Sequence, residues 1–290
     1  MQFQAAREGF LVQLDADGRS PHTKGQYRRH INSLIAWFDQ HGHPATVAHL
    51  SPDLLAQFFA DPTTQTSCRG GRKKASSSNA MRTSVRCFAT WLHDSGHVKA
   101  NPARMLRRAR CAAPPPRSLH LAEQERLQQV LATASGPAAM RDRMLVELLL
   151  GAGLRIGSAI ATNIEDIDFD HGELALRTTK GDRPTNTILP RHFAARLQEF
   201  VGERTEGPVF RAGDRRVSLR HMQRRLAQWF KVVGIVGRSA HSLRHSFATG
   251  LLAKTGDIRL VQAAMHHASI VSTTIYAQVG KDRLRAAVGA

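Results

Sequence analysis

The chain has 290 residues, of which 42% are hydrophobic, so it can bury a substantial core and disorder is excluded as its main state. Lysine and arginine number 41 against 23 aspartate and glutamate, which gives a formal net charge of +18 and a pI near 11.2. This surplus favours a polyanionic partner, although a genome biased toward arginine codons would produce the same excess.

The first 111 residues contain patterns for helices and none for strands. A first helix is expected to end near Asp17 and Gly18. A second begins at Ser20 and Pro21, because a capping hydroxyl followed by proline favours a helix start. Its apolar stripe at helical spacing consists of Tyr27, Ile31, Leu34, Ile35 and Phe38. Two more helices are predicted over residues 51–59 and 78–94; the second is closed by Gly96, and its inward residues are Met81, Val85, Phe88 and Leu92.

Basic side chains lie beside these apolar stripes and in the polar loop between the helices. They are Lys24, Arg28, Arg29, Arg72, Lys73, Lys74, Arg82 and Arg86. Each one alone fits a solvated helix face equally well. As a group they are interpreted as a DNA-binding surface, because cationic side chains supply many of the contacts that proteins make to phosphate.

Three consecutive prolines at positions 114–116 forbid helix and favour an extended connector. We therefore predict a helical domain over residues 1–111, a linker over residues 112–118 and a second domain with a C-terminal tail over residues 119–290. Sixteen Lys and Arg stand against seven Asp and Glu in the first 111 residues, and 25 against 16 in the remainder, so each part carries a net charge of +9. Two equally basic domains are expected to grip one duplex.

The second domain is predicted to be mostly helical with one strand pair. An apolar helix over residues 142–150 stops at a glycine-rich turn, and strands over residues 173–178 and 185–189 flank a second turn. Helices follow over residues 218–233, 242–254 and 258–265. The fold class is therefore mainly α with a small β-sheet, in which a helical domain precedes an α+β domain.

Four short stretches of the second domain contain residues suited to phosphodiester chemistry. They are Gly153-Leu154-Arg155, Thr179-Lys180-Gly181, His241-Ser242-Leu243-Arg244-His245 and the segment that runs from His267 to Tyr276. Two fixed guanidinium groups, Arg155 and Arg244, can stabilise the charge that develops on phosphoryl oxygens without a metal. Tyrosine can form a covalent phosphoester when a nearby base such as histidine takes its proton.

Taken singly, each of these residues also fits a role without chemistry. Tyr276 could anchor packing, Lys180 could be an exposed turn residue, and His266 and His267 could be polar residues at a helix end. His241 and His245, four apart on a helix, could ligate zinc. The segment, however, lacks the glutamate of an HExxH motif and offers no cysteine or close carboxylate. Neither a metal nor a cofactor is predicted.

The order and spacing of the four stretches resemble the tyrosine recombinase, or integrase, family, which includes the Xer recombinases, phage integrases and Cre. Residues 153–158 are similar to its GLRxSE box and Lys180 to the lysine of its GKG hairpin. Residues 241–249 resemble its HxLRHxFAT box, and residues 265–276 its LGHxxxxTTxxY box. The first 111 residues resemble the family's SAM-like core-binding domain through Thr23, Tyr27, Leu34, Trp37 and Asn101-Pro102-Ala103.

The resemblance implies a site-specific DNA recombinase that cleaves and rejoins DNA through a 3′-phosphotyrosyl intermediate, in integration, excision or resolution. It implies that Tyr276 is the nucleophile, His241 its base and Lys180 the acid that protonates the leaving oxygen. Arg155, Arg244 and His267 would hold the phosphate. It also implies a homotetramer on two double-stranded DNA sites with an inverted-repeat core, strand exchange through a Holliday junction, and a C-terminal tail exchanged between protomers.

Three features depart from the family pattern. Ser158 stands where the first box has an acidic residue, and His266 stands where the last box has glycine. The segment between Lys180 and His241 is compact. The serine removes an acidic partner expected to support the site. Because a histidine replaces the glycine, only spacing indicates whether His266 or His267 is the phosphate ligand.

Two other functions stay open at this stage: a type IB topoisomerase-like enzyme that relaxes DNA with the same chemistry, and a non-catalytic DNA-binding regulator that kept the fold. The cysteines Cys68, Cys87 and Cys111 are odd in number and lack CxxC spacing, which fits a reducing compartment. The longest charge-free apolar stretch, residues 148–154, is far shorter than the ~20 residues of a membrane span. We expect a cytoplasmic protein with no membrane partner.

Overall fold

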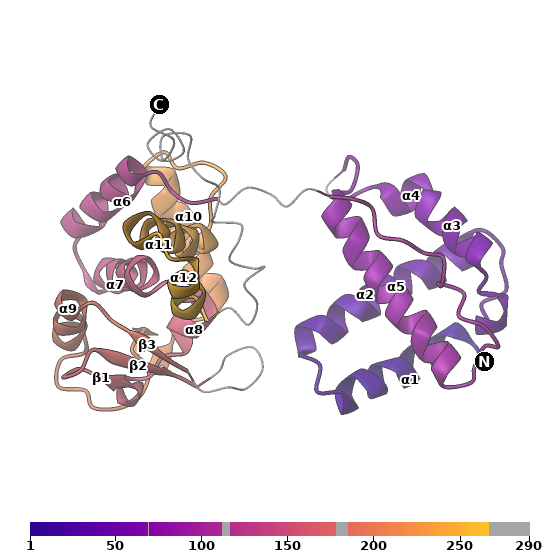
Figure 1. Ribbon diagram of the computed structural model, residues 1–290, viewed down its shortest axis with the longest axis horizontal. Helices are drawn as coiled ribbons and strands as arrows, with labels where there is room; N and C mark the ends of the chain where they lie inside the picture. Colours follow the sequence, from indigo (N-terminus) through magenta and orange to yellow (C-terminus); the bar gives the residue numbers. More distant parts are fainter. Residues whose placement is uncertain (69, 112–116, 178–184, 267–290) are drawn as a thin grey trace. The chain divides into compact units, whose positions relative to one another are not determined.

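The computed structural model describes residues 1–68, 70–111, 117–177 and 185–266 (Figure 1). The chain divides into two compact units, Met1–Ala112 and Ala113–Ala290. The two main apolar clusters fall one in each unit, so each unit has a core of its own. Among the described helices, none is both long and apolar enough to cross a membrane.

The first unit is a bundle of helices around an aromatic core. Its elements are α1 (Phe3–Ala16), α2 (Pro21–Gln40), the 3₁₀ turn η1 (Val47–His49), α3 (Pro52–Ala60), α4 (Pro62–Gln65) and α5 (Ala75–Asp94). Helices α1, α2 and α5 pack against one another. Fully buried Phe3, Phe38, Phe58 and Phe88 fill the space between the helices, so large rings supply much of the apolar area that holds this unit together.

The predicted start of α2 and the predicted end of α5 are confirmed, whereas α5 begins at Ala75, three residues before its predicted start. Helix α2 begins at Pro21, and the Ser20 hydroxyl accepts a hydrogen bond from the Thr23 backbone N–H at 3.3 Å. Helix α5 ends at Asp94, and Gly96 adopts φ +75° just beyond it. The predicted stripe of α2 is buried apart from Tyr27, which is half-buried.

The second unit is built around one central helix. Its helical elements are α6 (Leu121–Thr133), α7 (Pro137–Ala152), α8 (Ile156–Ala161), the 3₁₀ turn η2 (Ile164–Asp166), α9 (Arg191–Val201), α10 (Leu219–Val232), α11 (Ala240–Thr255) and α12 (Ile258–Ala264). Helix α7 contacts α6, α8, α9, α10 and α11, and α12 packs on α11 (Figure 1). Buried side chains on several sides of α7 explain why it takes the centre.

The predicted pair of strands is confirmed, but the prediction that it is the only pair is wrong, because the described residues contain further strands. Strands β1 (Ile167–Asp168), β2 (Glu173–Leu176) and β3 (Thr185–Ile188) form an antiparallel sheet in the order β1-β2-β3, in which Leu174 pairs with both Ile167 and Thr187. A second hairpin joins β4 (Arg211–Ala212) and β5 (Arg215–Arg216). The three missed strands have two residues each, too few to display an alternating pattern.

Candidate active site

The turn that carries Arg155 depends on a glycine. Gly153 ends α7 in the left-handed conformation with φ +62°, and a Cβ atom built on it would lie 2.1 Å from the Phe247 ring of α11. Only glycine meets both demands, so the chain turns tightly under α11. Leu154 is buried, while Arg155 is exposed and caps the start of α8.

Arg244 joins this turn to the end of α12. The residue is 2% exposed and lies on α11, where one terminal nitrogen donates to the Gly153 carbonyl and the other to the Met265 carbonyl. These two bonds tie together segments that lie more than one hundred residues apart in the sequence. The guanidinium therefore fixes the turn that carries Arg155 relative to the C-terminal end of α12.

Two histidines extend the cluster along α11. The rings of His241 and His245 meet edge to face, with centroids 4.7 Å apart. Burial lowers the pKa of His241 below its usual value, and the charges of Arg244 and Arg155 lower it further. Burial, followed by the effects of His241 and Arg244, lowers the pKa of His245 to about 4. Both rings are consequently neutral near pH 7, and His241 can accept a proton.

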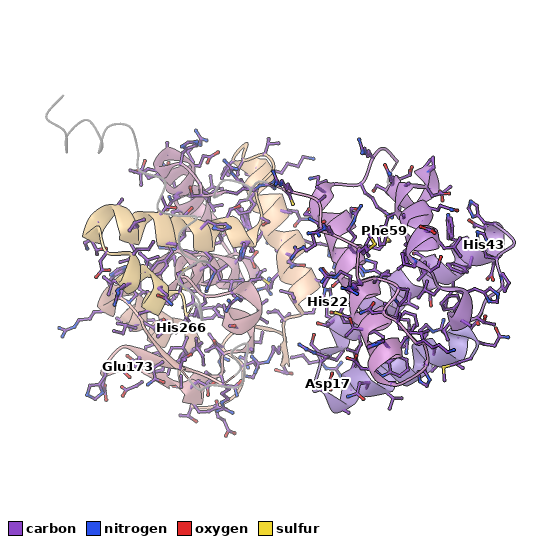
Figure 2. The ribbon with its side chains drawn as sticks, turned by 45° about the vertical axis from the view of Figure 1, so that its right-hand side comes forward. Asp17, His22, His43, Phe59, Glu173 and His266 are labelled. Carbon is purple, nitrogen blue, oxygen red and sulfur yellow. The ribbon has the colours of Figure 1, made fainter. Side chains whose placement is uncertain are left out.

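His266 lies at the C-terminal end of α12 (Figure 2). It adopts φ +49°, the left-handed region that favours glycine. Burial lowers its pKa below the usual value, and the charges of Arg244 and Arg155 lower it further. The predicted catalytic set does not include this residue. Its signal in the sequence is its place, since it occupies the glycine position of the family's last box.

The strand that leads toward Lys180 is anchored by carboxylates. Arg177 follows β2, and its guanidinium bonds to Asp166 and lies 3.4 Å from the Glu165 carboxylate. The Asp166 side chain is only 5% exposed. With Asp166 and Arg177, Ser158 lines a cavity of about 20 Å³. A carboxylate is thus present next to the position where Ser158 replaces the acidic residue of the family box.

The structure brings together three of the six predicted catalytic residues, Arg155, His241 and Arg244. Lys180, His267 and Tyr276 lie outside the described residues. Among the described residues of the second unit, no group of three His, Cys, Asp or Glu side chains is arranged to hold a metal ion.

The eight basic residues of the first unit do not share one surface. Four of them, Arg29, Arg72, Lys73 and Lys74, line a groove of about 1160 Å³ formed by α2, α4, α5 and the loop before α5. Serine and threonine hydroxyls and His30 line the same groove. It offers the donors that a phosphate backbone requires.

The other four basic residues lie elsewhere on the first unit. Lys24 is paired with Asp15, and Arg28 lies 4.0 Å from Glu8. Arg82 stacks over the Phe59 ring at 4.8 Å and lines a separate cavity between α3 and α5. Arg86 lines a third cavity, beside Tyr27 and Trp91. The DNA-binding prediction for these four therefore has less geometric support than that for the groove.

Residues 118–283 match the model of the phage integrase family, and residues 8–96 match that of the phage integrase N-terminal SAM-like domain. The chain belongs to the phage integrase family. It is a Xer-like tyrosine recombinase, an enzyme that carries out site-specific DNA recombination. The expected fold class and the expected enzyme class are both confirmed.

Two relatives of this integrase-family chain match it along nearly their whole length. Tyrosine recombinase XerC of Yersinia pestis is 31% identical over 286 residues, which cover 96% of this chain and 91% of that protein. Tyrosine recombinase XerC of Xylella fastidiosa (strain M23) is 33% identical over 276 residues, covering 93% and 90%. Both units of the chain are thus present in proteins named as recombinases.

Solved recombinase structures share the fold at low sequence identity. The XerH recombinase in a post-cleavage complex with palindromic difH substrate superposes with a TM-score of 0.75 at 19% identity, covering 96% of this chain and 84% of that one. A lambda integrase dimer bound to a COC′ core site gives a TM-score of 0.71 at 17% identity, covering 94% and 97%. The helical unit followed by an α+β unit is therefore the recombinase architecture.

Proposed function

We propose that this recombinase cuts one DNA strand by attack of Tyr276 on the scissile phosphate, leaving a 3′-phosphotyrosyl link and a free 5′-hydroxyl. The observation that carries the proposal is the pair of bonds from Arg244 to the carbonyls of Gly153 and Met265. Those bonds join the turn that carries Arg155 and the end of α12 to α11, the helix on which His241 lies. In the sequence, α12 is followed by His267 and Tyr276. Metal-free phosphoryl transfer needs a nucleophile, a base and cations that stabilise the phosphate, and this chain offers Tyr276, His241 and the two arginines for these roles.

In this mechanism each proton has a named donor and acceptor. The Tyr276 oxygen forms the new bond to phosphorus as its proton passes to His241, whose lowered pKa keeps the ring neutral and ready to accept. The bond from phosphorus to the 5′ oxygen breaks, and Lys180 protonates that oxygen. Arg155, Arg244 and His267 stabilise the charge on the non-bridging oxygens. Reversal of the same steps rejoins the strand without an energy cofactor.

The groove of the first unit is the proposed contact to the duplex outside the cut. Arg29, Arg72 and Lys74 line it and are exposed, while Lys73 donates to the Thr64 carbonyl at 2.7 Å and lies partly buried. Lysine and arginine bind the phosphate backbone irrespective of sequence and so position the protein on DNA. Lys24, Arg28, Arg82 and Arg86 are proposed as additional contacts on other faces of this unit.

We further propose assembly as a homotetramer on two sites with an inverted-repeat core, with strands exchanged through a Holliday junction and the C-terminal tail passed between protomers. The supporting comparisons are the XerH complex with palindromic difH and the lambda integrase dimer on a core site. A two-fold arrangement of protomers matches a DNA site with inverted symmetry, which is why a palindromic core is the expected target.

The decisive experiment captures the covalent intermediate. Wild-type protein and the Tyr276→Phe variant are incubated with fragmented DNA of the source genome and denatured, and the protein-linked DNA ends are sequenced. Ends that cluster at one inverted repeat and vanish in Tyr276→Phe are expected, because only the phenol oxygen can form the phosphoester.

Two other outcomes would replace the proposal. Scattered ends that still depend on Tyr276 would indicate a topoisomerase-like DNA relaxer. Native DNA retention without an adduct, repeated on nicked substrates so that rapid religation cannot hide the intermediate, would indicate a DNA-binding regulator.

A further inference from the structure

A histidine outside the predicted catalytic set directly follows the residue whose backbone is bonded to Arg244. His266 follows α12 directly after Met265, whose carbonyl accepts a hydrogen bond from Arg244. The guanidinium that holds the Gly153 turn therefore also holds the backbone that carries this imidazole. Arg244 thus sets where the backbone of His266 lies relative to the turn that carries Arg155.

One ring nitrogen of His266 lacks a hydrogen bond within the part of the chain that the structure describes. That atom, Nε2, is buried. Buried polar atoms of native proteins nearly always have a partner, and one without protein partners commonly reflects a bound ligand or a functional role. The groups whose charge acts on the ring are Arg155 and Arg244, and both attract an anion.

The backbone at His266 gives a second, independent indication. At φ +49° a non-glycine side chain is strained, and the structure keeps a bulky ring there. Strained residues of this kind cluster at active sites, where the surrounding structure holds them in place. Gly96 and Gly256, which take φ values of +75° and +73° after α5 and α11, show the residue this chain uses at other helix ends.

We propose that His266 is a further ligand of the scissile phosphate, donating its Nε2–H to a non-bridging oxygen held between Arg155 and Arg244. The proposal rests on the proposed function and adds a donor to it, alongside His267 rather than in its place. It also gives a physical reason for a histidine at a position where the family box has glycine: the lost backbone freedom is exchanged for one more hydrogen bond to the reacting group.

The test uses the full-length chain and a nicked duplex bearing the mapped site, from which cleavage cannot religate. Single-turnover cleavage, DNA affinity and melting temperature are measured for wild type, His266→Gly, His266→Gln and Tyr276→Phe. His192→Gln, an exposed histidine on α9, is the matched control. Glutamine keeps an N–H at similar reach and the same backbone strain, whereas glycine removes both the donor and the strain.

We expect His266→Gly to cleave about 100-fold more slowly than wild type, the usual loss for one donor to a developing oxyanion. Its melting temperature should equal or exceed that of wild type, and its DNA affinity should be unchanged. His266→Gln should recover much of the lost rate, and His192→Gln should match wild type.

Wild-type cleavage by His266→Gly would overturn the inference while leaving the recombinase function intact. Equal losses in the glycine and glutamine variants would overturn it too, since the ring would then act through packing. If His266→Gly failed to fold, the glutamine variant alone would decide, because a tenfold or greater loss there rules out a donor role of the kind proposed. Absence of a Tyr276-dependent adduct in wild type would instead remove the proposed function itself.

Discussion

Gly153 is the single position on which the geometry of Arg155 depends. We predict that Gly153→Ala destabilises the second unit by about 2 kcal/mol or more, because alanine is strained at φ +62° and its Cβ would displace the Phe247 ring. Denaturant unfolding measures the change. Gly157→Ala is the control, since nothing lies within 4 Å of a Cβ there and the position is helical, so that variant should be unchanged or slightly more stable. Equal unfolding midpoints for the two variants would contradict the prediction.

The lowered pKa of His241 predicts how the cleavage rate falls on the acidic side of its pH profile. A proton acceptor must be neutral, and a pKa below the usual value keeps the ring neutral to lower pH. With DNA below saturation, the cleavage rate should therefore stay level as the pH falls to about 6.5 and decline only below it. DNA affinity of Tyr276→Phe over the same pH range separates binding from chemistry. A decline centred above the ordinary histidine value would show that His241 is not the base.

Among the secondary-structure elements, a buried carboxylate joins the central helix to α10. The fully buried Asp142 accepts hydrogen bonds from Arg141, Arg225 and the Trp229 indole, at 2.8 to 3.2 Å. In Asp142→Asn an N–H₂ group would face these donors, and buried Arg141 would lose its counter-charge. We expect a loss of about 3 kcal/mol in the free energy of unfolding, measured in urea. The exposed Asp170→Asn serves as the comparison, and equal stability of the two variants would refute the argument.

The sequence predicts several of the long elements because their patterns repeat several times. The stripe and caps of α2 indicate its position, and the apolar run that stops at Gly153 indicates the core and the end of α7. Helices α6 and α9 were not predicted, although Phe193, Leu197 and Val201 of α9 follow a helical spacing. The two-residue strands had no such signal.

The sequence likewise predicts some features of the candidate site and not others. Motif spacing and residue type predict Arg155, His241 and Arg244 as catalytic, and the structure brings the elements that carry them together. Motif spacing left His266 only as an alternative to His267, because the sequence shows neither the backbone angle nor the unpartnered nitrogen on which its proposed role rests. Nor could it sort the eight cations of the first unit, since the sequence does not reveal that Lys24 is paired with Asp15 while Arg72 lines a groove.

For the molecule as a whole, the net charge of +18 predicts DNA binding that weakens steeply with salt. Each cation that displaces a counterion contributes about one unit to the slope of log affinity against log salt concentration. A cation already paired with a carboxylate displaces less, because its charge is partly compensated before DNA arrives. The distribution of charge between paired and unpaired positions, and not the total alone, should therefore set the slope.

Arg72 and Lys24 allow this idea to be tested within one domain. Arg72 is exposed in the groove, whereas Lys24 is paired with Asp15. We predict that Arg72→Ala reduces the salt slope by about one unit at every DNA sequence tested, and that Lys24→Ala reduces it by less than half as much. Binding of the full chain to fluorescent duplexes, titrated at several salt concentrations, provides both slopes. If the two variants lose equal slope, then DNA displaces Asp15 from Lys24 and the contact surface extends beyond the groove to α1 and α2; if only Lys24→Ala changes, the groove is not where the duplex binds.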